Sequence, residues 1–163
     1  MRCCMALIAL AVCGIGFVSP SGGQTPALAV MEDPMAPAAR EAAAVVDAFH
    51  AALARKDAAA ALALLADDVV IYEVGHVERS KAEYASHHLK ADADYASIVP
   101  SSLLRRKGGA SGDLAWIASE GRTTGRYHDK PIDQLTTESM LLHREAAGWR
   151  IVHVHWSSRK APT

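Results

Sequence analysis

Cysteine is nearly absent from this 163-residue chain, and its three cysteines all lie near the start, at Cys3, Cys4 and Cys13. The rest of the chain therefore has no thiol that could form a disulfide, act as a nucleophile or bind a metal ion. We expect the folded domain to be held together by packing alone.

Clustered positive charge is missing as well. The 17 Lys and Arg residues are scattered along the sequence and are balanced by 18 Asp and Glu residues. Nucleic acids and anionic membrane surfaces are recognised by concentrated positive charge, so the sequence predicts neither of these partners.

Several catalytic motifs are also missing. There is no G-x-S-x-G motif of nucleophilic hydrolases and no H-E-x-x-H zinc motif. The glycine-rich segment at 108–112 is not followed by the helix and lysine of a phosphate-binding loop. These absences argue against nucleophilic hydrolysis, zinc-protease chemistry and nucleotide binding.

The first 29 residues have the composition of an export signal. Arg2 gives a positive start, an apolar run follows, and helix-breaking residues precede the Ala-Leu-Ala triplet at 27–29. We expect residues 1–29 to be a signal peptide, so that the protein is periplasmic or secreted and is not held in the membrane after cleavage. The division expected for the rest is a flexible lead-in, one folded domain and a tail, at 30–38, 39–159 and 160–163.

Three helices are predicted in the first half of the mature chain. Apolar residues recur at helical spacing over 40–55. Asp57 is in position to cap a second helix. Ser80 and Glu83 form a capping-box sequence, S-x-x-E, at the start of a third helix over 81–91.

The remaining segments have the pattern of strands. Residues 69–73 are β-branched and aromatic and are followed by Gly75. After Asp94, four alternating segments separated by turn residues predict consecutive antiparallel strands, and Pro100 indicates an edge or bulged strand. The predicted fold class is α+β, with three N-terminal helices packed on a curved, mainly antiparallel sheet.

The last strand contains two histidines in alternation. One face would carry Ile151, His153, His155 and Ser157, and the other Val152, Val154 and Trp156. We expect His153, His155 and Ser157 to face a pocket while the apolar face meets core or a second subunit. The alternative orientation leaves both imidazoles in water.

The partner of His155 depends on the register of the last hairpin. A four-residue turn places Glu138 opposite His155, whereas a bulge at Gly148 places Ser139 there. A carboxylate next to the imidazole would favour its charged form. The sequence leaves both registers open.

The chain resembles the SnoaL-like branch of the nuclear-transport-factor-2-like superfamily, which includes DUF4440-type exported proteins and ketosteroid isomerases. The resemblance is carried by the order of elements, by the segments DDVVIYE and GHVERSKAEYASHHL, and by the ending Trp149-x-Ile151-x-His153-x-His155-x-Ser157. It implies a cone-shaped fold, a deep pocket between helices and concave sheet, and a homodimer through the sheet. It implies no single chemistry. The steroid isomerases take their key tyrosine from the first helix, where this chain has Phe49 and His50.

The candidate ligand-pocket residues come from several elements. They are Tyr72, Tyr84, His88, Trp116, Glu120, Glu138, His153, His155 and Ser157. The alternatives are a core role for Tyr84 and Trp116 and a solvated surface position for Glu120 and His88.

Three functions are consistent with these residues. The leading interpretation is the binding of a small, partly apolar ligand. The first alternative is an acid–base isomerase or dehydratase in which His153 or His155, tuned by Glu138, acts as the base. The second alternative is a dimeric interaction module.

No cofactor is expected, with a divalent metal ion as the alternative. His153 and His155 would project the same way with α-carbons about 7 Å apart, close enough to share an ion. Glu138 or His88 would supply a third ligand.

Overall fold

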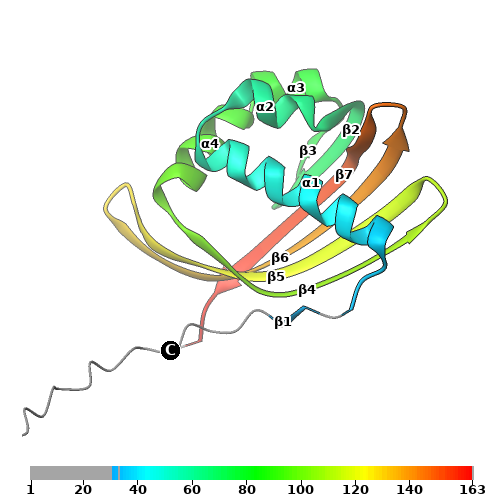
Figure 1. Ribbon diagram of the computed structural model, residues 1–163. Coiled ribbons are helices and arrows are strands. Elements are labelled where there is room, and N and C mark those ends of the chain that lie inside the picture. Colours follow the sequence, from blue (N-terminus) through cyan, green and yellow to red (C-terminus); the bar gives the residue numbers. More distant parts are fainter. Residues whose placement is uncertain (1–30, 33, 163) are drawn as a thin grey trace, which may run out of the picture.

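The computed structural model describes residues 31–32 and 34–162, which form four helices and seven strands (Figure 1). The helices are α1 (Pro37–Ala54), α2 (Ala58–Ala63), α3 (Lys81–Ser86) and α4 (Leu89–Ile98). The strands are β1 (Met31–Glu32), β2 (Leu65–Glu73), β3 (His76–Glu78), β4 (Ser101–Ser111), β5 (Leu114–Tyr127), β6 (Lys130–Glu145) and β7 (Gly148–Lys160). The expected signal peptide lies outside the described residues. Among those residues, no helix is both long and apolar enough to cross a membrane.

The strands form one sheet in the order β1-β4-β5-β6-β7-β2-β3. Strands β4 to β7 are consecutive and antiparallel, whereas β2 runs parallel to β7 and β1 parallel to β4. The sheet curves around the helices, which cover its concave face (Figure 1). The predicted α+β class, with helices on a curved and mainly antiparallel sheet, is confirmed.

The boundaries of the domain differ from those expected. The lead-in predicted to be flexible contains β1 and the first residues of α1, which starts with Pro37 at a position where a proline costs no hydrogen bond. At the other end, β7 continues to Lys160, and the buried Ala161 donates its N–H to the carbonyl of Asp133. The backbone at both ends of the domain is therefore paired.

The helix caps predicted at Asp57 and Ser80 are both formed. The side chain of Asp57 accepts a hydrogen bond from the N–H of Ala60 at 3.0 Å, which starts α2. Ser80 Oγ accepts from the N–H of Glu83 at 3.1 Å. The side chain of Glu83 bonds the N–H of Arg79 rather than that of Ser80.

The third helix is not continuous. The sequence predicted one helix over 81–91, but α3 ends at Ser86 and α4 starts at Leu89. The two residues between them, His87 and His88, both turn toward Glu78. Helix α4 then continues to Ile98, through residues that were expected to begin a strand.

The hydrophobic core lies between α1 and one half of the concave sheet face. Phe49 of α1 is fully buried against a row formed by Ile117 of β5, Met140 of β6 and Val154 of β7, each with no exposed surface. These three strand residues pair in register across the sheet. Packing of this row fixes α1 on the sheet.

A β-bulge in β7 sets the faces of the last strand. Leu142 pairs with Ile151 and Leu141 pairs with His153, so Val152 is an extra residue. Ile151, Val154 and Trp156 therefore share the concave face, whereas His153 and His155 lie on the convex face. Ser139 is opposite His155, the second of the two registers considered, but the extra residue is Val152 instead of Gly148.

Candidate functional site

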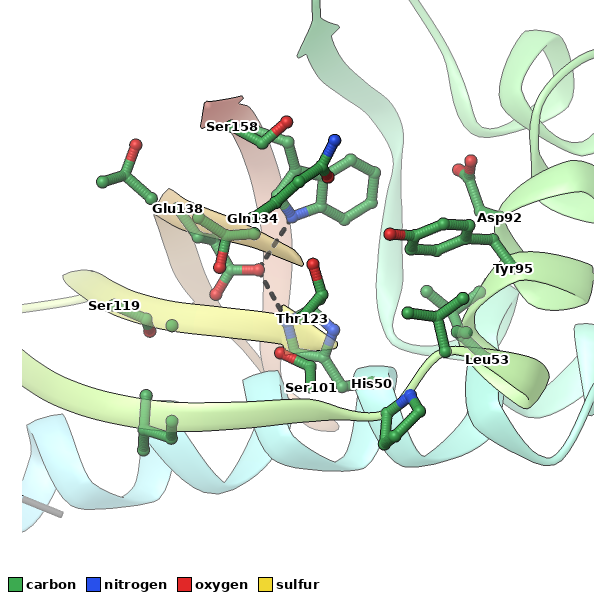
Figure 2. Close-up of a pocket in the computed structure, with 18 of the residues that line it drawn as sticks. His50, Leu53, Asp92, Tyr95, Ser101, Ser119, Thr123, Gln134, Glu138 and Ser158 are labelled. Atoms are coloured by element: carbon green, nitrogen blue, oxygen red, sulfur yellow. Dashed lines mark hydrogen bonds and ion pairs between the residues drawn. The ribbon is translucent and has the colours of Figure 1, made fainter. Parts of the chain in front are cut away.

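A cavity of about 900 Å³ lies between α1, α4 and the concave face of the sheet (Figure 2). Its apolar lining includes Leu53, Tyr95, Val99, Leu103 and Ile132. Its polar lining includes His50, Asp92, Arg106, Ser119, Thr123, Gln134, Glu138 and Ser158. The cavity thus combines an apolar wall with hydrogen-bonding groups.

The change from core to cavity occurs along the strands. The inward row that follows the core row of Ile117 consists of Ser119, Glu138 and Trp156, which pair in register. The next inward row, Gly121, Thr136 and Ser158, has only small or polar side chains. Small side chains leave the space between sheet and helices unfilled, and this creates the cavity.

Glu138 is the centre of the polar part. Its carboxylate is buried, with 9 % of the residue exposed. One oxygen, Oε2, accepts hydrogen bonds from the indole Nε1 of Trp156 at 2.8 Å and from Nε2 of His50 at 2.6 Å (Figure 2). The other oxygen, Oε1, is buried and has no hydrogen-bond partner among the described residues. Three elements, α1, β6 and β7, are therefore joined at one carboxylate.

The contact between His50 and Glu138 favours the charged form of each group. Burial lowers the pKa of His50, but the hydrogen bond to Glu138 and its negative charge outweigh burial and raise that pKa above 6.5. Burial raises the pKa of Glu138, but the bond and charge of His50 outweigh burial and leave it below 4.5. The His50 side chain is 44 % accessible, and this accessible part borders the cavity. An imidazolium can therefore meet a ligand.

A second ion pair lies beside the first. Arg106, only 4 % exposed, donates from Nη1 to Asp47 at 2.7 Å and from Nε to Ser119 Oγ at 3.2 Å. Both charged residues line the cavity. The positive charge of Arg106 contributes to the lowered pKa of Glu138.

A further acidic group lies on the α4 side of the cavity. Asp92 lies across from Glu138, next to Tyr95 (Figure 2). Burial and the negative charge of Glu73 raise the pKa of Asp92 to about 6, against a hydrogen bond from the hydroxyl of Tyr84 at 2.9 Å. Near neutral pH, Asp92 can therefore either donate or accept a proton.

Three of the predicted pocket residues lie at the cavity. They are Glu138, Glu120 and Ser157. Glu120 and Ser157 both pair with Thr137. Strand alternation turns the side chains of Glu120, Thr137 and Ser157 away from those of Ser119 and Glu138, so they border the cavity through their backbone.

The prediction that His153 and His155 face the pocket is corrected. Neither residue lines the cavity, because the Val152 bulge places both imidazoles on the convex face. There the ring of Tyr72 makes edge contacts with both, at centroid distances of 5.1 and 6.4 Å. Trp116, 47 % exposed, lies on the same face, so it and Tyr72 are not pocket residues either.

Tyr84 and His88 lie at a different place. Both line a small hollow of about 10 Å³ beside β3, together with Glu78. His88 contacts Glu78 beside β3, so it does not lie near His153 and His155 and cannot complete the metal site considered for them. Glu138, the other ligand considered for that site, is on the concave face, so the structure does not assemble it.

Sequence reasoning missed His50, Trp156, Arg106 and Asp92. The available signal for His50 was its spacing from Val46, because residues four apart share a helix face and this one is otherwise apolar. Trp156 was predicted to lie on the sheet face away from the pocket, because strict alternation takes no account of a bulge.

The comparisons agree with this architecture. A family model described as SnoaL-like domain matches residues 42–160, and the chain belongs to this family. A comparison with curated proteins gives no match.

Among solved structures, a candidate ketosteroid isomerase from Shewanella frigidimarina is 39 % identical over 76 % of this chain and 100 % of its own, with a TM-score of 0.71. A nuclear-transport-factor-2-like protein of unknown function from Pseudomonas putida is 22 % identical over 77 % of this chain and 87 % of its own, with a TM-score of 0.63. The CaMKII hub of S. rosetta is 23 % identical over 78 % of this chain and 100 % of its own, with a TM-score of 0.64. The last two share the fold.

Proposed function

We propose that the cavity binds a small, partly apolar molecule whose polar group meets the His50–Glu138 pair. The observation that carries this proposal is a buried carboxylate, bonded by two donors, at one end of a cavity of about 900 Å³. Cavities of roughly 300–1,000 Å³ with an apolar wall and a few placed polar groups are typical of small-molecule sites.

The lining indicates the chemistry of the ligand. An apolar ring or chain fits against Leu53, Tyr95 and Val99. A carbonyl, hydroxyl or weakly acidic group at the other end would accept hydrogen bonds from the His50 imidazolium or from Arg106. Binding would bury the apolar part, and the charged donors would fix its orientation.

The test is mass spectrometry of small molecules extracted from the purified protein, comparing wild type with His50→Gln. Loss of a hydrogen bond from a charged donor costs about 1.5–3 kcal/mol, so we expect at least about a tenfold loss of bound ligand. His153→Gln, on the convex face, is the matched control and should retain the ligand. Equal retention by both variants, or loss only in the control, would contradict the proposal.

Acid–base catalysis is the second candidate function, and His50 replaces the imidazoles first considered for it. The observation in its favour is a pair of pKa values shifted in opposite directions, with Asp92 at about 6 across the cavity. Glu138 holds Nε2 of His50, and Nδ1 has no hydrogen-bond partner among the described residues. In its neutral form, His50 would accept a substrate proton at Nδ1 and return it to the product, while Glu138 accepts from Nε2–H and orients the ring.

Proton abstraction can be measured with a probe. We would follow deuterium incorporation into a small β,γ-unsaturated cyclic ketone in D₂O by NMR, as expected for an isomerase-type site. Wild type should accelerate exchange, and His50→Gln should lose about 100-fold or more of that acceleration while His153→Gln retains it. Exchange that does not depend on His50 would reject the catalytic role and leave the binding proposal standing.

We also propose that two copies associate through the convex face of the sheet. Tyr72, Trp116 and Leu141 are each more than 40 % exposed there. Some similar structures are association or hub domains, and this supports the proposed self-association. Light scattering should show a dimer that Trp116→Glu dissociates. The control, Ile98→Glu on the exposed end of α4, should leave it intact.

Export is the remaining part of the proposal. It rests on the signal-like composition of residues 1–29. Intact-mass measurement on protein recovered outside the cytoplasm should give the chain that starts at Val30. Full-length protein in the cytoplasm would contradict it.

A further inference from the structure

A second cluster of titratable side chains lies outside the cavity, where α3 meets β3. Glu78, Glu83 and His87 each place one potential ligand atom within 4.8 Å of the others. His88 contacts the second oxygen of Glu78, and the ring of His76 lies 5.5 Å from that of His88. None of these five residues lines the large cavity.

The local backbone brings these groups together. Glu83 lies in α3 and His87 directly follows the last residue of α3, and both place a potential ligand atom near Glu78 of β3. Neighbouring residues of a regular helix point about 100° apart and could not both reach one carboxylate. The interruption at His87 and His88 lets their Nδ1 atoms contact Oε2 and Oε1 of Glu78, respectively.

We propose that Glu78, Glu83 and His87 form a binding site for a divalent transition-metal ion of the zinc type. Imidazole and carboxylate together are ligands that such ions accept. The two carboxylates and a neutral imidazole carry a charge that one divalent cation balances.

One of the three distances between ligand atoms matches that around a tetrahedral ion, and the other two are within 4.8 Å. With Zn–N and Zn–O bonds of about 2.0–2.2 Å, two ligand atoms lie roughly 3.3–3.5 Å apart. The distance from His87 Nδ1 to Glu78 Oε2 is 3.3 Å. Glu83 can keep its bond to the N–H of Arg79 with one oxygen and bind the ion with the other.

The solvent exposure of His87 and the contact between His88 and Glu78 also fit a metal site. Only 5 % of the Glu78 side chain is exposed, whereas 59 % of the His87 side chain is, so the ion has a path from solvent and a position for water. His88 bonds the oxygen of Glu78 that does not face His87, which orients the carboxylate.

The test is calorimetric titration of the chelator-treated protein with zinc chloride at pH 7. We expect saturable binding of one ion in wild type and at least a roughly tenfold weaker affinity in His87→Ala and in Glu83→Gln. Glu83→Gln retains an acceptor for the N–H of Arg79, so the start of α3 is preserved. His87 is exposed, so its replacement should leave the thermal midpoint unchanged.

The matched control is the double variant His153→Ala/His155→Ala, which removes a histidine pair from the convex face. It should bind zinc as wild type does, and crystals soaked in zinc should give an anomalous peak between Glu78, Glu83 and His87. The proposal is overturned by the absence of saturable binding, by unchanged affinity in both site variants, or by loss of binding in the control.

Discussion

The substitution Glu138→Gln tests the charged pair at the centre of the cavity. The amide keeps the shape of the side chain but removes its charge. In wild type the hydrogen bond and charge of Glu138 raise the pKa of His50 against the opposing effect of burial. In the Glu138→Gln variant the burial effect is left largely unopposed, so the pKa of His50 should fall from above 6.5 to below it.

The same substitution should lower the free energy of unfolding. A hydrogen bond to a charged group contributes about 1.5–3 kcal/mol and one between neutral groups about 0.5–1.5 kcal/mol. Making the two bonds from His50 and Trp156 neutral at the acceptor should therefore cost roughly 2 kcal/mol in total. Because the His50 side chain is 44 % accessible, solvent screens part of this contribution. We therefore expect a loss of about 1–2 kcal/mol, or a thermal midpoint lower by roughly 2–8 °C.

The loss should depend on pH in a defined way. A raised His50 pKa stabilises the fold below pH 6.5, and this contribution is lost as pH rises through the folded-state pKa. A lowered Glu138 pKa stabilises it above pH 4.5, and this contribution is lost as pH falls through its folded-state pKa. The difference in the free energy of unfolding between wild type and variant should be largest between pH 4.5 and pH 6.5, where both contributions are present.

Two measurements check this prediction. NMR titration of the imidazole signals, with His50 assigned by His50→Gln, gives its pKa in both proteins, and urea unfolding at several pH values gives the stability. Glu120→Gln, a carboxylate at the rim whose side chain points away from Glu138, is the control and should change neither quantity. An unchanged His50 pKa in Glu138→Gln, or a stability loss that is the same at every pH, would refute the electrostatic argument.

Two further predictions concern the fold. Leu142→Ala removes a fully buried side chain and should cost about 2–5 kcal/mol in urea unfolding, whereas Leu141→Ala, at a position that is 46 % exposed, should cost much less; equal costs would contradict the assignment of faces in β6. Asp57→Ala removes the cap of α2 and should lower stability by about 1 kcal/mol, which Asp57→Asn should largely restore; no loss in the alanine variant would show that the cap is not used.

Local rules predicted most of the fold. The apolar stripe of α1, the caps at Asp57 and Ser80, and the run of consecutive antiparallel strands β4 to β7 each depend on neighbouring residues, and these features appear as expected. The interruption of the third helix did not follow from local rules. It depends on Glu78, a residue on another element, whose buried carboxylate contacts both histidines.

The site was harder to predict because it depends on pairs that are distant in the sequence. His50 and Glu138 are 88 positions apart, and nothing in either local segment indicates the other. The resemblance to a family with a pocket between helices and sheet placed Glu138 among the candidates. Its partner could be identified only after α1 was packed against β6.

The bulge at Val152 determines which chemistry the cavity can contain. Strict alternation after Ile151 would turn His153 and His155 toward the helices and Trp156 toward the convex face. The extra residue reverses this, so that Trp156 donates to Glu138 from inside and packs against Phe49 at a ring distance of 6.2 Å. A single inserted residue thus exchanges two imidazoles for one indole, and the imidazole that remains in the cavity is supplied by α1.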